Sequence, residues 1–282
     1  MTILVVGASG AVGGLVLKGL RERGEEVRAT SRDPKKLAET AQVPVFAADL
    51  NEPASLAAAL AGVERVFLYA DVDEPEALAA EIARSDARHI VLLSSSSVTS
   101  PGAEADFNAS RFLRVERAFR ESGVGMTFLR PGGFASNAAR WSWGVKADSA
   151  VPLPYPEAVQ VPVHEADIAD VAVIALTADL ADDALIGAAP TLTGPERLTL
   201  REQVATIGEV IGRPVGVIEQ TEAESAAMLS RYVPEVWVRQ IIKGWREAVG
   251  AEPEISDEYR RLTGRPARSF RTWVEDHVAL FR

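Results

Sequence analysis

Residues 3–14 have the sequence ILVVGASGAVGG, in which an apolar run leads directly into three regularly spaced glycines. The run does not alternate polar with apolar residues, which predicts a strand buried on both faces. A segment with helical spacing begins near Val12. Gly7 allows a tight turn, Gly10 allows another group to approach the backbone, and Gly13 allows the helix to pack closely on the strand. The stretch predicts a strand–turn–helix unit.

The same alternation continues over the first half of the chain. Short β-branched runs predict strands at Thr2–Val6, Glu26–Thr30, Val43–Ala47, Arg65–Tyr69, His89–Ser94 and Met126–Arg130. Segments with helical spacing lie between them, at Val12–Arg23, Pro34–Thr40, Pro53–Ala61, Pro75–Ala83 and Asp106–Ser122. Strands that alternate with helices form parallel sheets with helices on both faces. The sequence therefore predicts an α/β fold with a Rossmann-type, doubly wound parallel sheet.

The second half of the chain has a different pattern. Proline, glycine and tryptophan cluster from Pro131 to Pro162, which predicts long loops. Further elements are expected as helices at Asp167–Thr177, at Leu198–Ile211 with Thr199 as its N-cap and Glu202 three residues later, and over most of 222–282, and as a strand at Val215–Glu219. We expect a dinucleotide-binding Rossmann core at 1–133. Residues 134–282 are expected to supply loops, returning strands and a small, mostly helical substrate-binding region.

Composition limits the classes of partner. The 282 residues carry a net charge of −10 at pH 7, and such an acidic chain repels nucleic acid. The chain has no cysteine, which suits a cytoplasmic protein and excludes thiolate chemistry. No apolar run approaches the roughly 20 residues that span a bilayer, so no membrane partner is expected. The three histidines lie far apart, so no metal site is expected, and a homodimer is left open.

The glycine-rich turn predicts a bound dinucleotide. The N-terminus of the following helix presents free N–H groups and a partial positive charge to phosphate. A glycine turn without a ligand is the alternative, but the flanking strand and helix favour dinucleotide binding. The residues expected to contact the cofactor here are Gly7, Ala8, Ser9, Gly10, Ala11, Val12 and Gly13.

The end of the second predicted strand indicates which dinucleotide is preferred. An acidic residue at this position binds the ribose 2′-hydroxyl of NAD, whereas an arginine accommodates the 2′-phosphate of NADP. Ser31 and Arg32 occupy the tip here, Lys36 follows, and Asp33 comes too late to take the acidic role. The sequence predicts NADP(H), preferred over NAD(H). The alternative is a solvated loop with ordinary charges.

Other strand ends are expected at the same edge of the sheet and therefore near the cofactor. They are Asp49 and Leu50 after the third strand, Tyr69 and Ala70 at the fourth, and Ser94 and Ser95 at the fifth. Asp49 can accept from the adenine amino group or, alternatively, cap the segment after Asn51. Ser94 or Ser95 is expected near the nicotinamide, unless the four consecutive serines form only a polar turn.

The motifs GASGAVGG, TSRDPKK, LLSSSS, FLRPGGFASN, DIADVA, LTGPERLT and GRPARSFRTWV occur in an order that resembles NmrA-like proteins. These are atypical relatives of the short-chain dehydrogenases, and the resemblance covers essentially the whole chain. It implies a Rossmann domain, NADP(H) binding and a small C-terminal region that encloses a substrate pocket. The family includes NADPH-dependent quinone and dye reductases, aryl-ether reductases, and regulators that bind the nucleotide without turnover.

One departure from the wider superfamily concerns the proton donor. Short-chain dehydrogenases carry Tyr-x-x-x-Lys on the helix after the fifth strand, and the matching residues here are Phe107 and Arg111. Phe107 cannot donate a proton, whereas Arg111 can hydrogen-bond ribose or a developing oxyanion. The candidate catalytic residues are therefore Arg111 and Ser95. The alternative places Phe107 in the core and makes Arg111 a surface charge.

Candidate substrate contacts follow the sixth predicted strand. They are Phe134, Asn137, Trp141 and Tyr155, and the alternative for the aromatic residues is ordinary packing. The leading hypothesis is an NADPH-dependent oxidoreductase that transfers hydride to a small, aromatic or quinone-like acceptor. The rival is a non-catalytic NADP(H) sensor that acts through a protein partner. An epimerase or dehydratase is disfavoured, because it would need the missing tyrosine.

Overall fold

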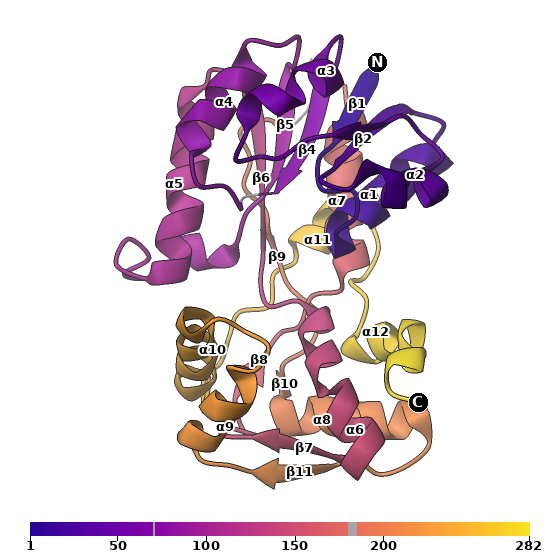
Figure 1. Cartoon of the computed structure of the whole chain (residues 1–282). Coiled ribbons are helices and arrows are strands. Elements are labelled where there is room, and N and C mark those ends of the chain that lie inside the picture. The colour runs from indigo at the N-terminus through magenta and orange to yellow at the C-terminus, as the bar shows by residue number, and fades with distance from the viewer. Residues whose placement is uncertain (70, 180–184) are drawn as a thin grey trace. The chain divides into compact units, whose positions relative to one another are not determined.

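The structure, a computed structural model, describes residues 1–69, 71–179 and 185–282, without the side chains of Lys36 and Thr40. The chain divides into two compact units (Figure 1). The first unit comprises Met1–Gly132, Glu165–Leu192 and Glu258–Gly264. The second unit comprises Gly133–His164, Thr193–Asp257 and Arg265–Arg282. The chain therefore enters each unit more than once.

A seven-stranded parallel sheet forms the centre of the first unit. Its strands are β1 (Thr2–Val5), β2 (Glu26–Ser31), β3 (Val45–Ala47), β4 (Arg65–Tyr69), β5 (His89–Leu93), β6 (Gly125–Pro131) and β9 (Thr191–Leu192). The order β3-β2-β1-β4-β5-β6-β9 reverses direction between β1 and β4, which is the point where a doubly wound sheet binds its ligand. The predicted fold class and the six predicted strands are confirmed. The strand β9, which has two residues and pairs with the end of β6, was not predicted from the sequence.

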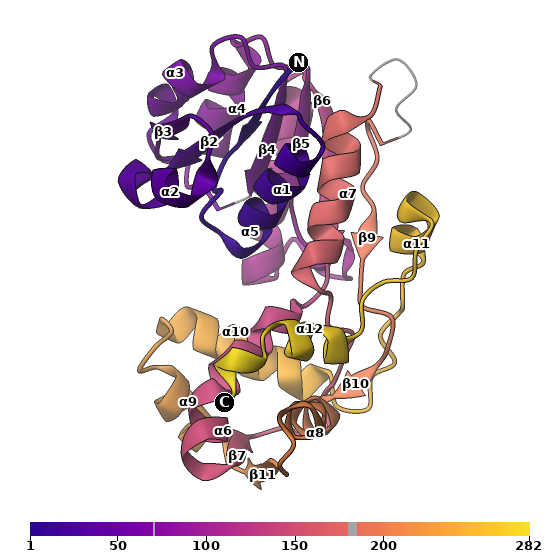
Figure 2. The ribbon, with the colours of Figure 1, turned by 90° about the vertical axis from the view of Figure 1, so that its right-hand side faces the viewer.

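Helices cover both faces of this sheet. The helical elements of this unit are α1 (Ala11–Glu22), α2 (Pro34–Ala41), α3 (Ala57–Leu60) after the 3-10 turn η1 (Pro53–Leu56), α4 (Pro75–Ala83), η2 (Ser96–Thr99), α5 (Phe107–Glu121), α7 (Glu165–Thr177) and α11 (Glu258–Thr263). Helices α1 and α7 lie side by side on one face (Figure 2). On the other face, α4 and α5 pack through Leu78, Ile82 and Phe119 in a buried cluster that includes strand residues such as Leu92. The helices leave the carboxyl ends of the strands at one edge of the sheet.

The second unit contains small sheets and helices. Its elements are η3 (Ala135–Trp141), α6 (Ser142–Asp148), β7 (Ala150–Leu153), β8 (Val159–Gln160), β10 (Leu198–Thr199), α8 (Leu200–Ile211), β11 (Gly216–Glu219), α9 (Glu222–Leu229), α10 (Glu235–Glu247), α12 (Phe270–Asp276) and η4 (Val278–Leu280). The predicted capping box of Thr199 and Glu202 is confirmed at the start of α8. Large aromatic side chains fill the core of this unit, among them Trp245, Phe270 and Trp273.

The prediction of long loops from Pro131 to Pro162 is wrong. This stretch forms η3, α6, β7 and β8. The strand β7 pairs in parallel with β11, so that Val151 lies opposite Val217. Such a pairing depends on residues far along the chain, and local composition does not reveal it. Within the described ranges, no helix is both long enough and apolar enough to cross a membrane.

Candidate nucleotide-binding and active site

The turn between β1 and α1 is closely packed around its glycines. Gly7 has a φ of 73°, a conformation that side chains disfavour. A Cβ added at Gly13 would lie 2.3 Å from the carbonyl oxygen of Gly7, and one at Gly10 would lie 3.2 Å from the same oxygen. The amide of Gly10 donates to that oxygen at 2.9 Å. The glycine spacing is therefore required by the backbone itself.

The N-terminus of α1 is open to an anion. Its N-cap is Gly10, and within the described part of the chain no side chain caps the helix. Its first turn carries no acidic residue, and Ser9, Gly10 and Ala11 are exposed, whereas Ala8 and Val12 are buried. Uncapped amides at a helix N-terminus bind phosphate. These residues therefore fit the pyrophosphate of a dinucleotide.

Other predicted residues lie at the ends of β2 and β3. Arg32 directly follows β2 and is exposed, while the Ser31 hydroxyl accepts from the amide of Asp33 at 3.1 Å. The Asp49 carboxylate accepts from the amide of Asn51 at 3.0 Å, which is the local capping role that the sequence left open. Leu50 is buried. The predicted contacts of the Lys36 side chain and of Ala70 lie outside the described residues.

Tyr69, at the end of β4, packs on the glycine turn. Its Cε1 atom lies 2.6 Å from the place where a Cβ of Gly7 would be. Burial raises the pKa of the Tyr69 phenol, the positive charge of Arg32 opposes this rise, and Asp71 and Asp49 add to it. The charges at the ends of β2 and β3 thus act on one side chain at the end of β4. The structure brings these predicted residues to one region of the sheet edge.

Helix α5 carries the two residues that stand in for the tyrosine and lysine. The Asp106 carboxylate caps the helix by accepting from the amides of Asn108 and Ala109 at 3.0 Å each. Phe107 is 42% exposed, so the alternative that placed it in the core is wrong. Arg111 donates to the Asp71 carboxylate at 2.8 Å, and the two side chains are 38% and 75% exposed. In this structure Arg111 is therefore engaged with the segment that follows β4.

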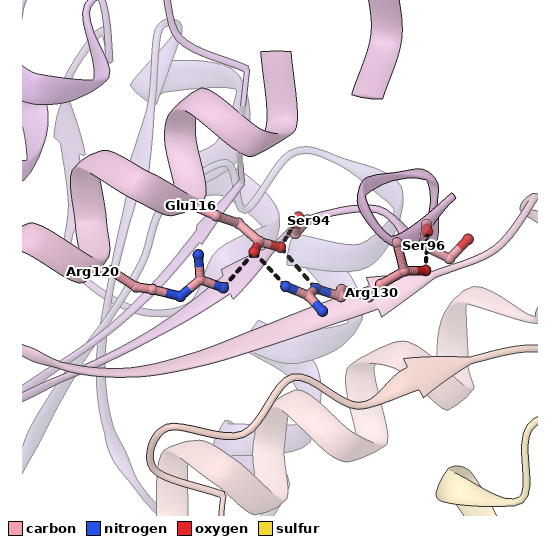
Figure 3. A network of polar contacts seen from close by, with 6 residues as sticks. Ser94, Ser96, Glu116, Arg120 and Arg130 are labelled. Atoms are coloured by element: carbon pink, nitrogen blue, oxygen red, sulfur yellow. Dashed lines mark hydrogen bonds and ion pairs between the residues drawn. The ribbon is translucent and has the colours of Figure 1, made fainter. Parts of the chain in front are cut away.

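A buried carboxylate connects the ends of β5 and β6 to α5 (Figure 3). The side chain of Glu116 has no exposed surface and accepts four hydrogen bonds. Ser94 donates to Oε1 at 2.7 Å, Arg130 donates to Oε1 at 3.0 Å and to Oε2 at 2.6 Å, and Arg120 donates to Oε2 at 2.7 Å. Burial alone would raise the pKa of Glu116, but these bonds outweigh it and hold that pKa below its ordinary value.

Glu116 was not predicted as a site residue, although the sequence carries a signal for it. Glu116 follows Val115 directly and precedes Phe119 by one helical turn, on the face of α5 that turns to the core. An acidic residue on an apolar helix face needs a partner, because burying an unpaired charge is strongly unfavourable. Arg130 of the FLRPGG motif is that partner.

Ser95, the other candidate catalytic residue, has a local role in this structure. It is the N-cap of η2, and its hydroxyl accepts from the amide of Ser97 at 3.2 Å. The hydroxyls of Ser95 and Ser97 also share a hydrogen bond of 2.9 Å. Ser95 and Ser97 thus form a polar turn, which was the alternative role that the sequence allowed for the consecutive serines. Both hydroxyls remain near the end of β5.

The candidate substrate residues lie in the second unit. Trp141 is only 7% exposed and belongs to the core, which is the packing alternative for that side chain. Phe134 is half-buried, and exposed Asn137 accepts from Arg140 at 2.8 Å. The Tyr155 hydroxyl donates to Glu222 and accepts from Arg246 at 3.2 Å. Two further contacts join Arg246 to Glu222, so the Tyr155 ring is held by an ion pair.

Nothing in the described ranges gathers three or more histidine, aspartate or glutamate side chains that could hold a metal ion. The polar chemistry of the first unit's strand edge instead consists of backbone amides, hydroxyls, arginines and paired carboxylates. Such groups bind phosphate, ribose and amide groups.

Comparison with known proteins agrees with a nucleotide-binding role for these polar groups. A model of the NAD(P)H-binding family matches residues 7–179, more than half of the chain. The chain is 38% identical over 284 residues to the (4-alkanoyl-5-oxo-2,5-dihydrofuran-3-yl)methyl phosphate reductase of Streptomyces griseus, which covers 99% of both chains. It is 30% identical over 293 residues to the NAD(P)H azoreductase of Xenophilus azovorans, again with 99% of both chains covered.

Solved structures show the same fold. The NADPH complex of the NADPH-dependent quinone oxidoreductase of Escherichia coli has a TM-score of 0.81 at 21% identity, and the match covers 99% of this chain and 100% of that chain. The family match spans the glycine turn and α5, and the sequence relatives extend it over the whole length. The chain therefore belongs to the NAD(P)H-binding family, in the NmrA-like branch of atypical short-chain dehydrogenases that its motifs resemble.

Proposed function

We propose that this protein is an NADPH-dependent reductase that transfers hydride to a small, conjugated and electron-poor acceptor of aromatic or quinone-like type. The observation that carries the proposal is the close-packed glycine turn at the uncapped N-terminus of α1. Two sequence relatives named for reduction, of an alkanoyl-furanone phosphate and of azo compounds, support the reaction class. Both relatives align with essentially the whole chain.

The preference for NADPH is part of the proposal and rests on Arg32. Its guanidinium is exposed directly after β2, where an acidic residue would instead favour the 2′-hydroxyl of NAD. A planar guanidinium can bind a phosphate through two parallel hydrogen bonds. Lys35 is exposed nearby and adds positive charge on the same segment. We therefore expect the 2′-phosphate to bind here.

The chemistry of the acceptor follows from the missing tyrosine. NADPH supplies the hydride when bound, and a proton must reach the acceptor separately. Phe107 cannot supply that proton, whatever its exposure. A quinone, dye or activated alkene delocalises the incoming electron pair and needs less acid assistance than a ketone does. We therefore expect turnover with such acceptors and little with simple ketones.

The chain's own residues bind and orient the reactants in this proposal. The amides of the glycine turn hold the pyrophosphate, and Ser94 and Ser95 lie by the nicotinamide. Arg111 binds ribose or a developing oxyanion after leaving Asp71, with which it pairs in this structure. Phe134, Asn137 and Tyr155 stay proposed substrate contacts, whereas Trp141 is buried in the core of the second unit. Orienting hydride donor and acceptor is one expected source of the rate enhancement.

The rival function is a nucleotide sensor that binds NADP(H) without turnover. It is favoured by Phe107, which occupies the position of the acid. The two functions differ in one observable: the sensor binds NADPH but does not oxidise it.

Binding and turnover are tested together. NADPH and NADH are titrated by fluorescence, and NADPH absorbance is then followed with a panel of quinones, azo dyes, triphenylmethane dyes, unsaturated lactones and simple ketones. The reductase proposal predicts tighter binding of NADPH and oxidation by at least one conjugated acceptor class. Binding of NADPH without its oxidation by any acceptor of the panel would reject the reductase proposal in favour of the sensor. Failure to bind either nucleotide would reject both proposed functions.

A further inference from the structure

The network around Glu116 does more than neutralise a buried charge. An ionised carboxylate has about four lone-pair sites for hydrogen bonds, and Glu116 uses four of them. Its partners come from the end of β5, the end of β6 and its own helix. Three elements that meet at the sheet edge are therefore tied to one carboxylate.

Arg130 and Arg120 fix the carboxylate from two sides. Arg130 binds both oxygens through a planar fork, a geometry that fixes direction as well as distance. The Arg120 guanidinium is itself held, since it lies 4.4 Å from the ring centroid of Phe128. The Arg130 amide also donates to the carbonyl of Pro190 at 2.9 Å. The acceptor that faces Ser94 is therefore rigidly placed.

This placement determines the direction of the Ser94 hydrogen bond. A carboxylate only accepts, so the single proton of the Ser94 hydroxyl is committed to Glu116. The Ser94 oxygen can then act toward a ligand only as a hydrogen-bond acceptor. The amide of Ser94 donates to the carbonyl of Leu129 at 2.8 Å, which ties the backbone of the same residue to β6. Ser95 follows directly and caps η2.

The position of this segment in the sheet indicates what it faces. The strand order reverses between β1 and β4, and a dinucleotide lies across that point. By the same rule, the adenosine half would lie over β1, β2 and β3, where Arg32 is, and the nicotinamide half would lie over β4, β5 and β6. Ser94 directly follows β5, and the carboxamide of nicotinamide carries an NH₂ group, a donor that matches an oxygen able only to accept.

We propose that Glu116 is a positioning residue, which holds Ser94 and the start of η2 in place for the nicotinamide half of the cofactor. The inference rests on the proposed function, because it assumes a bound nicotinamide dinucleotide. Glu116 itself is not expected to touch the cofactor or the acceptor. It acts through the Ser94 hydroxyl and through the ends of β5 and β6.

The test compares two ligands that differ only in the nicotinamide. NADPH carries both halves of the cofactor, whereas 2′-phospho-ADP-ribose carries the adenosine half, the pyrophosphate and a bare ribose. Glu116→Gln keeps the shape of the side chain but removes its charge. It also places an NH₂ group, itself a donor, against the donors of Ser94, Arg120 and Arg130. We expect this variant to bind NADPH about tenfold more weakly and 2′-phospho-ADP-ribose with the affinity of the unmodified protein.

A matched control lies on the same helix. Glu121→Gln makes the identical chemical change at an exposed position of α5 and is expected to leave both affinities unchanged. If Glu116→Gln does not fold, Ser94→Ala carries the test, because it removes one contact and leaves the pairing of Glu116 with the two arginines. Ser94→Ala is expected to show the same selective loss. Where both variants fold, the double variant should lose no more than either single one.

Equal weakening of both ligands would overturn the inference, since it would indicate a general structural role. Unchanged binding of NADPH by Glu116→Gln or, in its place, by Ser94→Ala would overturn it as well. Failure of the unmodified protein to bind either ligand is a different result. It would reject the proposed function, and this inference with it.

Discussion

Replacing Gly13 by alanine tests the glycine cradle directly. A Cβ at this position would lie 2.3 Å from the carbonyl oxygen of Gly7, whereas real Cβ atoms essentially never come closer than 3.0 Å. The start of α1 or the turn must therefore move by about 0.7 Å, the difference between these two distances. The shift displaces the amides that would face the pyrophosphate.

The change affects stability and binding differently. Alanine stabilises a helix interior by about 1 kcal/mol relative to glycine, while overpacking typically costs about 1–3 kcal/mol. The net loss of unfolding free energy should then be about 0–2 kcal/mol. Losing two charge-assisted hydrogen bonds, worth about 1.5 kcal/mol each at the low end, weakens NADPH binding by roughly 100-fold. Binding should therefore suffer more than folding.

The assay is a fluorescence titration of NADPH, with urea unfolding measured on the same samples. Gly19→Ala is the matched control, because it lies on α1 and the nearest atom to its Cβ would be Cγ2 of the Val173 side chain, at 3.0 Å, rather than a backbone atom. It should change stability slightly and leave the NADPH dissociation constant within about twofold of the unmodified value. A folded Gly13→Ala protein that binds NADPH within about threefold of the unmodified protein would refute the reasoning.

Three further changes test other parts of the site. Arg32→Ala should weaken NADPH binding by roughly 10–100-fold and leave NADH binding unchanged, as titration of both nucleotides would show; equal losses would remove the assignment to the 2′-phosphate. Arg111→Ala should cost less than about 1 kcal/mol of stability, since its ion pair with Asp71 is partly exposed, yet weaken NADPH binding about tenfold. Arg117→Ala is its control on the same helix, and an equally small effect on binding in both would exclude Arg111 from the site. Glu116→Gln should change acid stability. The folded-state pKa of Glu116 lies below its ordinary value of 4.5, so its contribution is present above about pH 4.5 and is lost as the pH falls through the folded-state value. Urea unfolding at several pH values should therefore show the variant approaching the unmodified protein in acid, and a constant gap would contradict this account.

The first unit was largely predictable because its signals are local. The strand, glycine turn and helix of residues 3–14 are contiguous, and β1, β4 and β5 are buried almost throughout, so their apolar runs identify them. The capping box at Thr199 was equally visible, since both partners lie within one helical turn. Signals of this kind do not depend on distant segments.

The missed features depend on distant segments. The strand β7 needs β11 as its partner, and β9 is only two residues long. The partners of Glu116 are Arg130, which lies on β6, and Ser94, which directly follows β5. The sequence allowed two interpretations of the aromatic residues after β6, as substrate contacts or as packing residues. Only the folded structure shows that Trp141 belongs to a core. Residue type alone does not distinguish an aromatic side chain that lines a pocket from one that packs in a core.

The central claim is hydride transfer from NADPH, and one measurement tests it most directly. The protein is mixed under anaerobic conditions with NADPH and a quinone or azo dye, and both the oxidation of NADPH and the reduction of the acceptor are followed. The account predicts that NADPH loss and two-electron acceptor reduction proceed in equal amounts and that NADPH supports a higher kcat/KM than NADH. Tight NADPH binding, with no oxidation above the rate seen without protein for any conjugated acceptor, would contradict it.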